Sequence, residues 1–354
     1  MNSTRTHTGG TEQAKYAGLL WDAVIAADEH TAHDVVHAAL DAGVSAESVL
    51  LDVIGAVQRR IGAEWAAAHI SVAQEHAATA INERVIAALP ARTGGTSVVH
   101  DRITVTCVDG EWHSLPARLL AETLTLRGFA VDYLGAQVPL PRLITHLHRT
   151  APDTVALSSS IPVRLPTAHA TITACQAAGV PVIAGGAAFG VDGRYARLLG
   201  AQAWAPDARA AADRLAEAPL PRPVGAPQPV DLLPHLADQE YSMVARSATA
   251  LVAAVYEGLA ESLPSMADYT ELEREHTAAD LAHIVDFLAT ALYVGDDDLF
   301  TGFLSWTVGI LAARGVPTHA LRAGLDLLAA ELRDFPRASG LLAAGAAHLE
   351  RLGA

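Results

Sequence analysis

The spacing of apolar residues changes twice along this chain, and the changes divide it into three parts. Residues 14–91 carry apolar side chains three and four positions apart, which is typical of amphipathic helices. Residues 98–217 alternate short apolar runs with helical stretches, and residues 235–354 return to helical spacing. The pattern predicts an α/β domain between two all-α regions.

The first part predicts an antiparallel bundle of four helices, because four stretches of suitable length have helical spacing. Gly43 and Gly62 are expected at helix ends, where glycine is common. Residues 92–97, which include Gly94 and Gly95, are expected to link the bundle to the next domain. The expected helices are Tyr16–Ala27, Thr31–Ala42, Ala46–Ile61 and Ser71–Leu89.

The middle part predicts a parallel sheet with helices on both faces, since strand-like runs alternate with helical stretches. Ligands of such sheets bind at the carboxyl ends of the strands. The expected strands are Ile103–Val108, Ala130–Leu134, Thr154–Leu157, Pro181–Ala184 and Ala203–Ala205, with helices beginning near Leu115, Pro139, Leu165 and Gly193. The loops expected to carry a site are 109–116, 135–138, 158–164 and 185–190.

A proline-rich stretch separates the sheet from the last part of the chain. Six prolines occur in the seventeen residues 218–234, which predicts an extended, semi-rigid linker. Pro317 and Pro336 stand where new helices are expected to start. The helices expected beyond the linker are Gln239–Leu263, Ser265–Tyr293, Asp297–Arg314, Thr318–Asp334 and Arg337–Leu352.

Composition argues against several classes of function. The net charge of −15 and the lack of a basic stripe argue against direct DNA binding, and favour small molecules or proteins as partners. Two cysteines, Cys107 and Cys175, fall in expected buried structure, which is typical of a reduced cytoplasmic protein. The polar segment Met1–Gln13 and the absence of an eighteen-residue apolar run predict neither a signal peptide nor a membrane span.

The loop after the first expected strand carries a histidine suited to metal binding. Residues 109–116 read Asp-Gly-Glu-Trp-His-Ser-Leu-Pro. A neutral imidazole is a good ligand for a borderline metal, so His113 is the candidate ligand. Glu111 is placed to accept the other ring N–H and so fix the tautomer. An ordinary loop histidine is the alternative that the spacing leaves open.

Residues 102–217 resemble the cobalamin-binding domain shared by corrinoid methyltransferases, mutases and light-responsive repressors. That family has a carboxylate, any residue, a histidine, two residues and a glycine after the first strand. This chain has Glu111 and His113 at the carboxylate and histidine positions of that motif, with glutamate in place of aspartate, and Pro116 in place of the glycine. The resemblance implies that His113 binds the cobalt of cobalamin.

Two further short motifs support the same resemblance. Ser158 and Ser159 stand where the family has a serine motif after the third strand, although only the first serine matches it. Gly185 and Gly186 match a double glycine after the fourth strand. In the family these residues line a slot for the nucleotide tail, because only small side chains let it pass against the sheet. An ordinary strand-to-helix turn is the alternative.

The first part resembles the helical cap that covers the upper face of cobalamin. Trp65, Glu75 and His76 have the spacing of the light-responsive repressors, in which these residues enclose the 5′-deoxyadenosyl group. An indole offers a flat apolar lid, and a carboxylate accepts hydrogen bonds from ribose hydroxyls. A core tryptophan with a solvated Glu–His pair is the alternative. Ala66 replaces the histidine that captures cobalt in those repressors after photolysis; His69 or His76 are the candidates to substitute for it.

The last part has one polar segment of note, on the expected helix that includes residues 271–283. Helical spacing puts His276, Asp280 and His283 on one face. A solvated face of an amphipathic helix explains this equally well. No cysteine lies in this part, so a thioether-linked pigment is excluded there.

The order of cap, corrinoid domain, linker and helical domain resembles the photocobilins, photoreceptors that pair cobalamin with biliverdin in a globin-like domain. The resemblance implies a cytoplasmic light-sensing signalling protein, not an enzyme, that binds adenosylcobalamin and, without a covalent bond, biliverdin. It would act through a protein partner or a homo-oligomer. A linear tetrapyrrole needs a pyrrole acceptor, for which Asp280 or His283 are candidates, and cations for its propionates. The candidate cations are Arg246, Arg274, Arg314 and Arg322.

Three other functions are open on the sequence. A corrinoid shuttle for methyl transfer would use the same cobalamin domain with a methyltransferase partner. A cobalamin- or haem-binding sensor would use His276 or His283 as a haem ligand. A scaffold would use its last helices only to dimerise.

Overall fold

The computed structural model describes residues 5–89, 100–225, 232–316 and 318–353. The chain divides into two compact units, residues 1–226 and 227–354, each described by itself below. The predicted linker at 92–97, the residues 226–231 of the proline-rich linker and the helix start at Pro317 lie outside the described residues.

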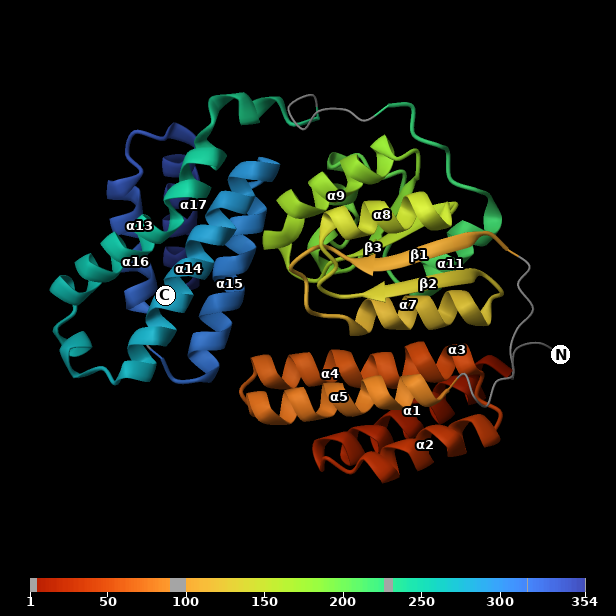
Figure 1. Ribbon diagram of the computed structural model, residues 1–354. Helices are drawn as coiled ribbons and strands as arrows, with labels where there is room; N and C mark the ends of the chain where they lie inside the picture. The colour runs from red at the N-terminus through yellow and green to blue at the C-terminus, as the bar shows by residue number, and fades with distance from the viewer. Residues whose placement is uncertain (1–4, 90–99, 226–231, 317, 354) are drawn as a thin grey trace. The chain divides into compact units, whose positions relative to one another are not determined.

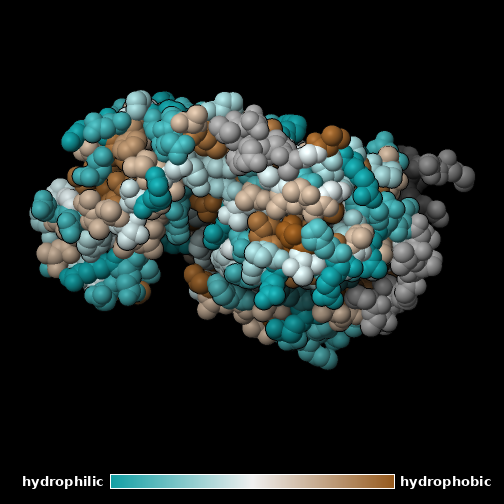
Figure 2. All heavy atoms as spheres, turned by 45° about the horizontal axis from the view of Figure 1, so that its top comes forward, coloured by the Kyte–Doolittle hydropathy of each residue, from teal (hydrophilic) through white to brown (hydrophobic). Residues whose placement is uncertain are grey.

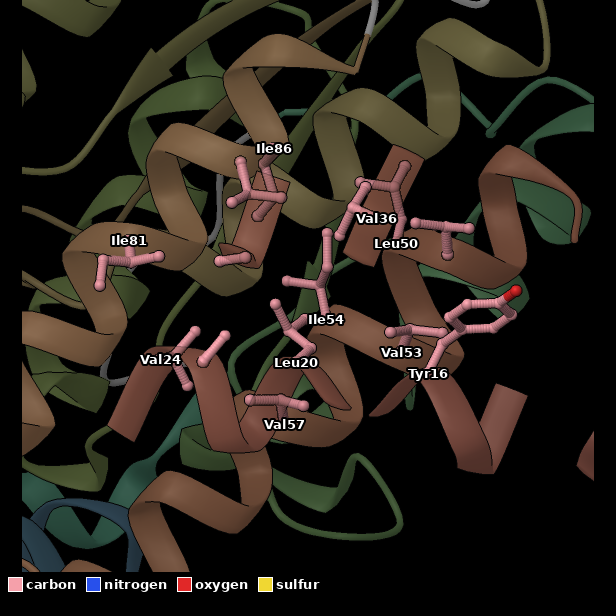
Figure 3. Packing of buried hydrophobic residues seen from close by; sticks show 14 of the residues in the cluster. Tyr16, Leu20, Val24, Val36, Leu50, Val53, Ile54, Val57, Ile81 and Ile86 are labelled. Carbon is pink, nitrogen blue, oxygen red and sulfur yellow. The ribbon is translucent and has the colours of Figure 1, made fainter. Parts of the chain in front are cut away.

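The first unit begins with helices that share one hydrophobic core. Leu20, Val36, Ile54 and Ile86 come from different helices, and each is almost completely buried in this core (Figure 3). Burying a side chain of this size contributes about 1.5–3 kcal/mol, so the shared core holds these helices together. The helical elements are α1 (Arg5–Ile25), α2 (Glu29–Asp41), α3 (Ala46–Ser48), the π-helix η1 (Val49–Ile54), α4 (Gly55–Ala66) and α5 (Val72–Ala88).

The two glycines expected at helix ends behave differently. Gly43 follows α2 with a φ of 87°, in the left-handed region that glycine adopts freely, as predicted. The prediction for Gly62 was wrong, because this residue lies inside α4, which continues to Ala66. A glycine inside a helix lowers the stability of that helix by about 1 kcal/mol relative to alanine. The neighbouring Ile61 is completely buried, and its burial can offset this loss.

The rest of the first unit is a five-stranded parallel sheet in the order β2-β1-β3-β4-β5. This confirms the predicted α/β architecture, and the strand order is the flavodoxin-like one. Helices α8 and α9 cover one face, and α7 and α11 cover the other (Figure 1). The strands are β1 (Arg102–Cys107), β2 (Ala130–Gly135), β3 (Thr154–Ser158), β4 (Val182–Gly185) and β5 (Ala203–Ala205). The helices are α7 (Leu115–Leu126), α8 (Leu140–Thr150), α9 (Leu165–Ala177), α10 (Arg194–Leu198) and α11 (Ala208–Glu217), with two short 3-10 helices, η2 (Pro162–Arg164) and η3 (Ala187–Phe189).

The sheet has its topological switch point between β1 and β3. Strand β1 pairs with β2 on one side and with β3 on the other, so the connections that follow β1 and β3 leave in opposite directions. A crevice forms at the carboxyl ends of such strands, and ligands of these sheets bind there. The loops after β1 and β3 are therefore the place to look for a site.

Helices α1 to α5 form a helical layer of the first unit, and helix α7 joins this layer to the sheet. Leu115 and Leu119 of α7 belong to the core of the helical layer, whereas the next turn of α7 contributes to the core under the sheet. Arg127, just past α7, donates to Glu47 at 2.8 and 2.9 Å. Arg209 of α11 donates to the same carboxylate at 3.0 Å. Apolar packing and an ion-pair network thus hold the two layers together.

All the regular secondary structure in the described residues of the second unit is helical. The predicted single helix 265–293 was wrong at its start, because a short 3-10 helix precedes α14. Thr270 begins α14 with a capping box, in which its side chain and Glu273 satisfy each other's backbone N–H groups. The elements are η4 (Pro234–Asp238), α13 (Glu240–Ser262), η5 (Pro264–Asp268), α14 (Glu271–Val294), α15 (Asp297–Ala313), α16 (His319–Glu331) and α17 (Pro336–Leu352).

Helices α13 and α14 are long and apolar enough to cross a membrane by length and composition alone. In α14, 56% of the apolar window is buried within the unit, as in the core helix of a globular domain. On the face shown in Figure 2, hydrophilic and hydrophobic residues are intermixed on both units. The absence of a membrane span stays a prediction.

Candidate functional site

The loop after β1 brings a glutamate and a histidine to the carboxyl edge of the sheet. Gly110, with a φ of 80°, lets the chain turn sharply after the strand. The N–H of Glu111 donates to the carbonyl of Val108 at 2.9 Å, which closes the turn. Helix α7 then starts at Leu115, with Pro116 in its first turn, where a missing N–H is harmless. His113 is therefore held on a short, well-connected loop.

Glu111 is completely buried and ties the β1 loop to the β3 loop. Its Oε1 accepts from the N–H groups of Trp112 and His113, both at 3.0 Å. Its Oε2 accepts from the N–H of Ser160 at 2.7 Å and from the Ser159 hydroxyl at 3.2 Å. One carboxylate thus spans the switch point between the two strands. The bond from Ser159 was not foreseen, because those residues lie 48 positions apart.

These hydrogen bonds keep Glu111 ionised despite its burial. Burial by itself raises the pKa of this carboxyl, but the His113 ring and the N–H groups of His113 and Ser160 outweigh it. The resulting pKa is about 2, below the usual 4.5. A charged acceptor therefore stands next to the imidazole at neutral pH.

The imidazole of His113 is oriented by this carboxylate. The distance between Nδ1 and Glu111 Oε1 is 2.6 Å, so Nδ1 carries the proton and the Nε2 lone pair is available. The His113 side chain is 35% exposed, and Nε2 has no hydrogen bond to another described residue. The ring of Trp112, itself half exposed, lies 4.1 Å from the imidazole between centroids. The loop thus presents the His113 imidazole at the sheet edge with its Nδ1 directed at Glu111.

The residues around His113 fit a metal that is already coordinated by a cofactor rather than by several protein side chains. No group of three histidine, cysteine or carboxylate side chains that could hold a metal ion is found among the described residues. Burial, with Glu111 adding to it, raises the pKa of the Cys107 thiol to about 12, so this neighbour offers no thiolate. His113, supported by the buried Glu111, would supply one nitrogen ligand to a metal whose other ligands come from a bound cofactor.

The serines and glycines singled out in the sequence lie beside this pair. Ser158 ends β3 and pairs in register with Gly185 of β4. Gly186 has a φ of 99°, and a Cβ there would lie 2.2 Å from the carbonyl oxygen of Ser159. Glycine is required here by the protein's own backbone, a reason that sequence reasoning had missed. A role in lining a nucleotide slot stays a prediction.

Helix α5 places one of the candidate residues, His76, near the same loop. Glu75 and His76 lie in the first turn of α5, and His76 Nδ1 lies 2.6 Å from Glu75 Oε2. The His76 ring is 6.5 Å from the Trp112 ring, centroid to centroid. Further along α5, Glu83 accepts a hydrogen bond from the Ser114 hydroxyl at 2.5 Å. Helix α5 therefore lies next to the loop that holds the candidate ligand.

The other two candidates of the helical layer lie near the end of α4. Trp65 is partly buried in the last turn of this helix. His69 follows the helix and is 69% exposed, with Nδ1 2.7 Å from Glu64. His69, proposed as a substitute cobalt ligand, is thus engaged with a carboxylate of its own helix end.

The second unit brings together the polar residues predicted on α14. Loss of hydration raises the pKa of Asp280, and His283, His276 and Arg314 counteract this rise, so all four groups lie close enough to interact. Asp280 is nevertheless exposed.

Three aromatic side chains of helices α14 and α15 lie close together. Phe287 of α14 stacks on Phe303 of α15 with ring centroids 3.9 Å apart, and the exposed Trp306 follows at 6.4 Å. Arg246, on α13, instead donates to the Ser242 carbonyl at 3.1 Å. A separate cavity of about 230 Å³ lies beside α13, with Met243, Leu251 and Phe335 among its lining residues.

Comparison with known proteins bears on the first unit. Residues 101–215 match a family described as B12 binding domain, and residues 17–89 match a second family of the same description. The two matches support a cobalamin-binding family. No curated protein matched the chain significantly.

Solved structures of corrinoid proteins are similar to part of the chain. The monomethylamine corrinoid protein of Methanosarcina barkeri is 22% identical, with a TM-score of 0.47, over 56% of this chain and 95% of that one. A cobalamin-binding protein of Desulfitobacterium hafniense is 19% identical, with a TM-score of 0.32, over 57% and 97%. The methanol:cobalamin methyltransferase complex of Methanosarcina barkeri is 16% identical, with a TM-score of 0.30, over 57% and 78%.

Proposed function

We propose that this protein binds adenosylcobalamin with His113 as the lower ligand to cobalt, and that it senses light through this cofactor rather than acting as an enzyme. One observation carries the ligand assignment. The fully buried Glu111 holds His113 Nδ1 at 2.6 Å, while the His113 side chain remains 35% exposed after β1 and its Nε2 has no hydrogen bond to another described residue. Cobalamin binding itself is supported by the two B12-binding domain matches.

The chain's own residues prepare the lower side before any cofactor arrives. Glu111 fixes the tautomer of His113 and, through Ser159 and Ser160, fixes the loop that carries it. Such a supporting carboxylate raises the basicity of a histidine ligand and typically contributes 10–100-fold (about 1.4–2.7 kcal/mol) to metal affinity. The serine and glycine residues 158–159 and 185–186 are proposed to border the nucleotide tail.

The upper side is assigned to the helical layer. When bound, adenosylcobalamin supplies a cobalt–carbon bond that light can break. Trp65, Glu75 and His76 are proposed to enclose the adenosyl group, because α5 lies against the His113 loop through the contact of His76 with Trp112. Loss of a group enclosed there would change the contacts between α5 and this loop, and such differential contacts are what shift a conformational equilibrium.

The second unit is proposed to bind biliverdin without a covalent bond. Asp280 lies near His276, His283 and Arg314, and this arrangement combines an acceptor for pyrrole N–H groups with a cation for a propionate. The stacked rings of Phe287 and Phe303 add a flat apolar surface. A sharp Soret band on purification would instead indicate haem bound through His276 or His283.

A corrinoid carrier for methyl transfer is the second candidate function. B12-binding domains are as much expected in such a carrier as in a sensor, and residues 17–215 would serve both. The two functions differ in what happens next. A sensor changes conformation or assembly on illumination, whereas a carrier exchanges a methyl group with a partner methyltransferase in the dark.

The test is an absorption titration of the full chain with adenosylcobalamin and with hydroxocobalamin, for wild type and His113→Ala. The expected result is a histidine-ligated cobalt spectrum in wild type that is lost in the variant, with affinity at least tenfold weaker. His30→Ala is the matched control, since His30 is 91% exposed on α2. An unchanged spectrum in His113→Ala contradicts the ligand assignment.

Illumination of the loaded chain then separates the two functions. A light-dependent change in hydrodynamic radius that requires adenosylcobalamin supports a sensor. Methyl transfer from methylcobalamin, without any such light response, supports the carrier instead. Adding biliverdin tests the second unit, because spectra that are a simple superposition of bound cobalamin and free pigment contradict bilin binding.

A further inference from the structure

A chain of hydrogen bonds runs through the helical layer of the first unit and ends on Glu75. Asn82 of α5 donates through Nδ2 to Gln58 Oε1 of α4 at 2.9 Å. Gln58 donates through Nε2 to the Thr79 hydroxyl at 2.8 Å. Thr79 in turn donates to Glu75 Oε1 at 3.0 Å. The chain therefore crosses from the buried side of α5 to its first turn.

The chemistry of the side chains gives this chain a fixed direction. The Gln58 carbonyl oxygen accepts from Asn82, so its amide nitrogen faces Thr79 and donates. A hydroxyl has one hydrogen, and with Gln58 occupying a lone pair, the Thr79 hydrogen is left for the carboxylate. Glu75 Oε1 is thus held as an acceptor, while Oε2 lies 2.6 Å from His76 Nδ1.

Stability alone does not explain these polar residues. Asn82 is completely buried beside Ala78 and Ile81, and its Oδ1 has no hydrogen-bond partner among the described residues. A buried, unsatisfied polar atom typically costs about 1–3 kcal/mol, so the Asn82 oxygen lowers the stability of this core. The arrangement retains the polar group whose amide orients Gln58.

We infer that Gln58, Thr79 and Asn82 are positioning residues that present Glu75 to the hydroxyl groups of the upper ligand. They would make the site prefer a cobalamin with a hydroxyl-bearing upper group, such as adenosyl, over one with a small upper ligand. The inference rests on the proposed function, since it needs cobalamin bound against α5. Among the described residues, the side-chain hydrogen bonds of Gln58, Thr79 and Asn82 connect them to one another and to Glu75, and none involves His113.

The test compares dissociation constants for adenosylcobalamin and hydroxocobalamin, measured in the dark on the full chain. Thr79→Val removes the donated hydrogen at nearly constant volume. We expect adenosylcobalamin binding to weaken about tenfold, the loss of one hydrogen bond to a charged group, while hydroxocobalamin binding changes less than about twofold. Thr79→Ser keeps the hydroxyl and should restore the wild-type ratio.

Two further variants separate positioning from folding. Thr145→Val is the matched control, because Thr145 is an exposed threonine of α8 that donates only to the Pro141 carbonyl. Asn82→Leu removes the amide that orients Gln58, so the preference for adenosylcobalamin should fall about threefold, and a thermal melt checks that the variant is folded.

The outcomes distinguish this inference from the proposed function. The positioning role is overturned if the variants bind both cobalamins more weakly by the same factor. It is also overturned if the ratio of the two dissociation constants is unchanged in both Thr79→Val and Asn82→Leu. Failure of wild type to bind either cobalamin, or retention of the cobalt spectrum in His113→Ala, overturns the proposed function itself. A selective loss that Thr79→Ser restores supports the inference.

Discussion

The candidate site of the first unit and that of the second differ in how far the protein itself organises them. Glu111 is completely buried and fixes His113 and the β3 loop through side-chain and backbone hydrogen bonds. Asp280 is exposed, and its histidine and arginine neighbours act on it through electrostatic attraction. The first arrangement is fixed by hydrogen bonds within the protein, whereas no hydrogen bond to the Asp280 side chain among the described residues fixes the second. Preorganisation of this kind lowers the cost of binding.

The largest effect on stability is expected at Gly186, where the backbone of the turn after β4 packs against the backbone of Ser159. Gly186→Ala would put a Cβ 2.2 Å from the Ser159 carbonyl oxygen at a φ of 99°. We expect the free energy of unfolding of the first unit to fall by roughly 3–4 kcal/mol, measured by urea denaturation.

A glycine of the second unit offers a control for Gly186→Ala, because an added methyl group is expected to be tolerated there. Gly302 lies inside α15, and a methyl group added to its Cα would have nothing within 4 Å, so Gly302→Ala should stabilise by about 0.5–1 kcal/mol. A tolerated Gly186→Ala would show that the turn after β4 can move away from Ser159.

A somewhat smaller effect is expected from the carboxylate itself. Glu111→Gln keeps the shape but removes the charge that four backbone N–H groups, one hydroxyl and one imidazole share. We expect a loss of roughly 2–3 kcal/mol in thermal or urea unfolding, and cobalamin binding weaker by about tenfold or more. Asp280→Asn, at the exposed counterpart, should change stability by less than about 0.5 kcal/mol. Equal effects of the two substitutions would remove the distinction between the sites.

The smallest effect concerns pH and the contact between the helical layer and the sheet. The hydrogen bond from Arg127, opposed in part by burial and aided by Arg209, lowers the pKa of Glu47 in the folded state. Its contribution is therefore fully present above the usual pKa of 4.5 and is lost as the pH falls below that value. We expect faster hydrogen exchange in α7 as the pH is lowered from about 5 to about 3, after correction for intrinsic exchange rates.

Glu47→Gln should flatten this pH dependence, with a change in stability of about 1 kcal/mol because the pair is partly exposed. The folded-state pKa of Asp280 is raised instead of lowered. Lowering the pH should therefore not destabilise the second unit through this residue. The same pH response in wild type and Glu47→Gln would assign acid sensitivity to other groups.

Much of the fold was predictable because its signals are local. The two changes in apolar spacing separate helical regions from the α/β region, and all five strands lie where alternation placed them. The errors were local as well. Gly62 was expected to end a helix, but the core packing of α4 carries the helix through it, and the Thr270 capping box starts α14 later than periodicity suggested.

By itself, the sequence determined which residues stand at the carboxyl end of β1 and that Glu111 precedes His113 by two positions, because a strand followed by a short loop is set by near neighbours. Only the tertiary structure decided that Glu111 also binds Ser160, 49 positions away, and that Gln58 meets Asn82, 24 positions away. Such contacts depend on how strands and helices are brought together in the fold, and burial then turns a local pair into a fixed site.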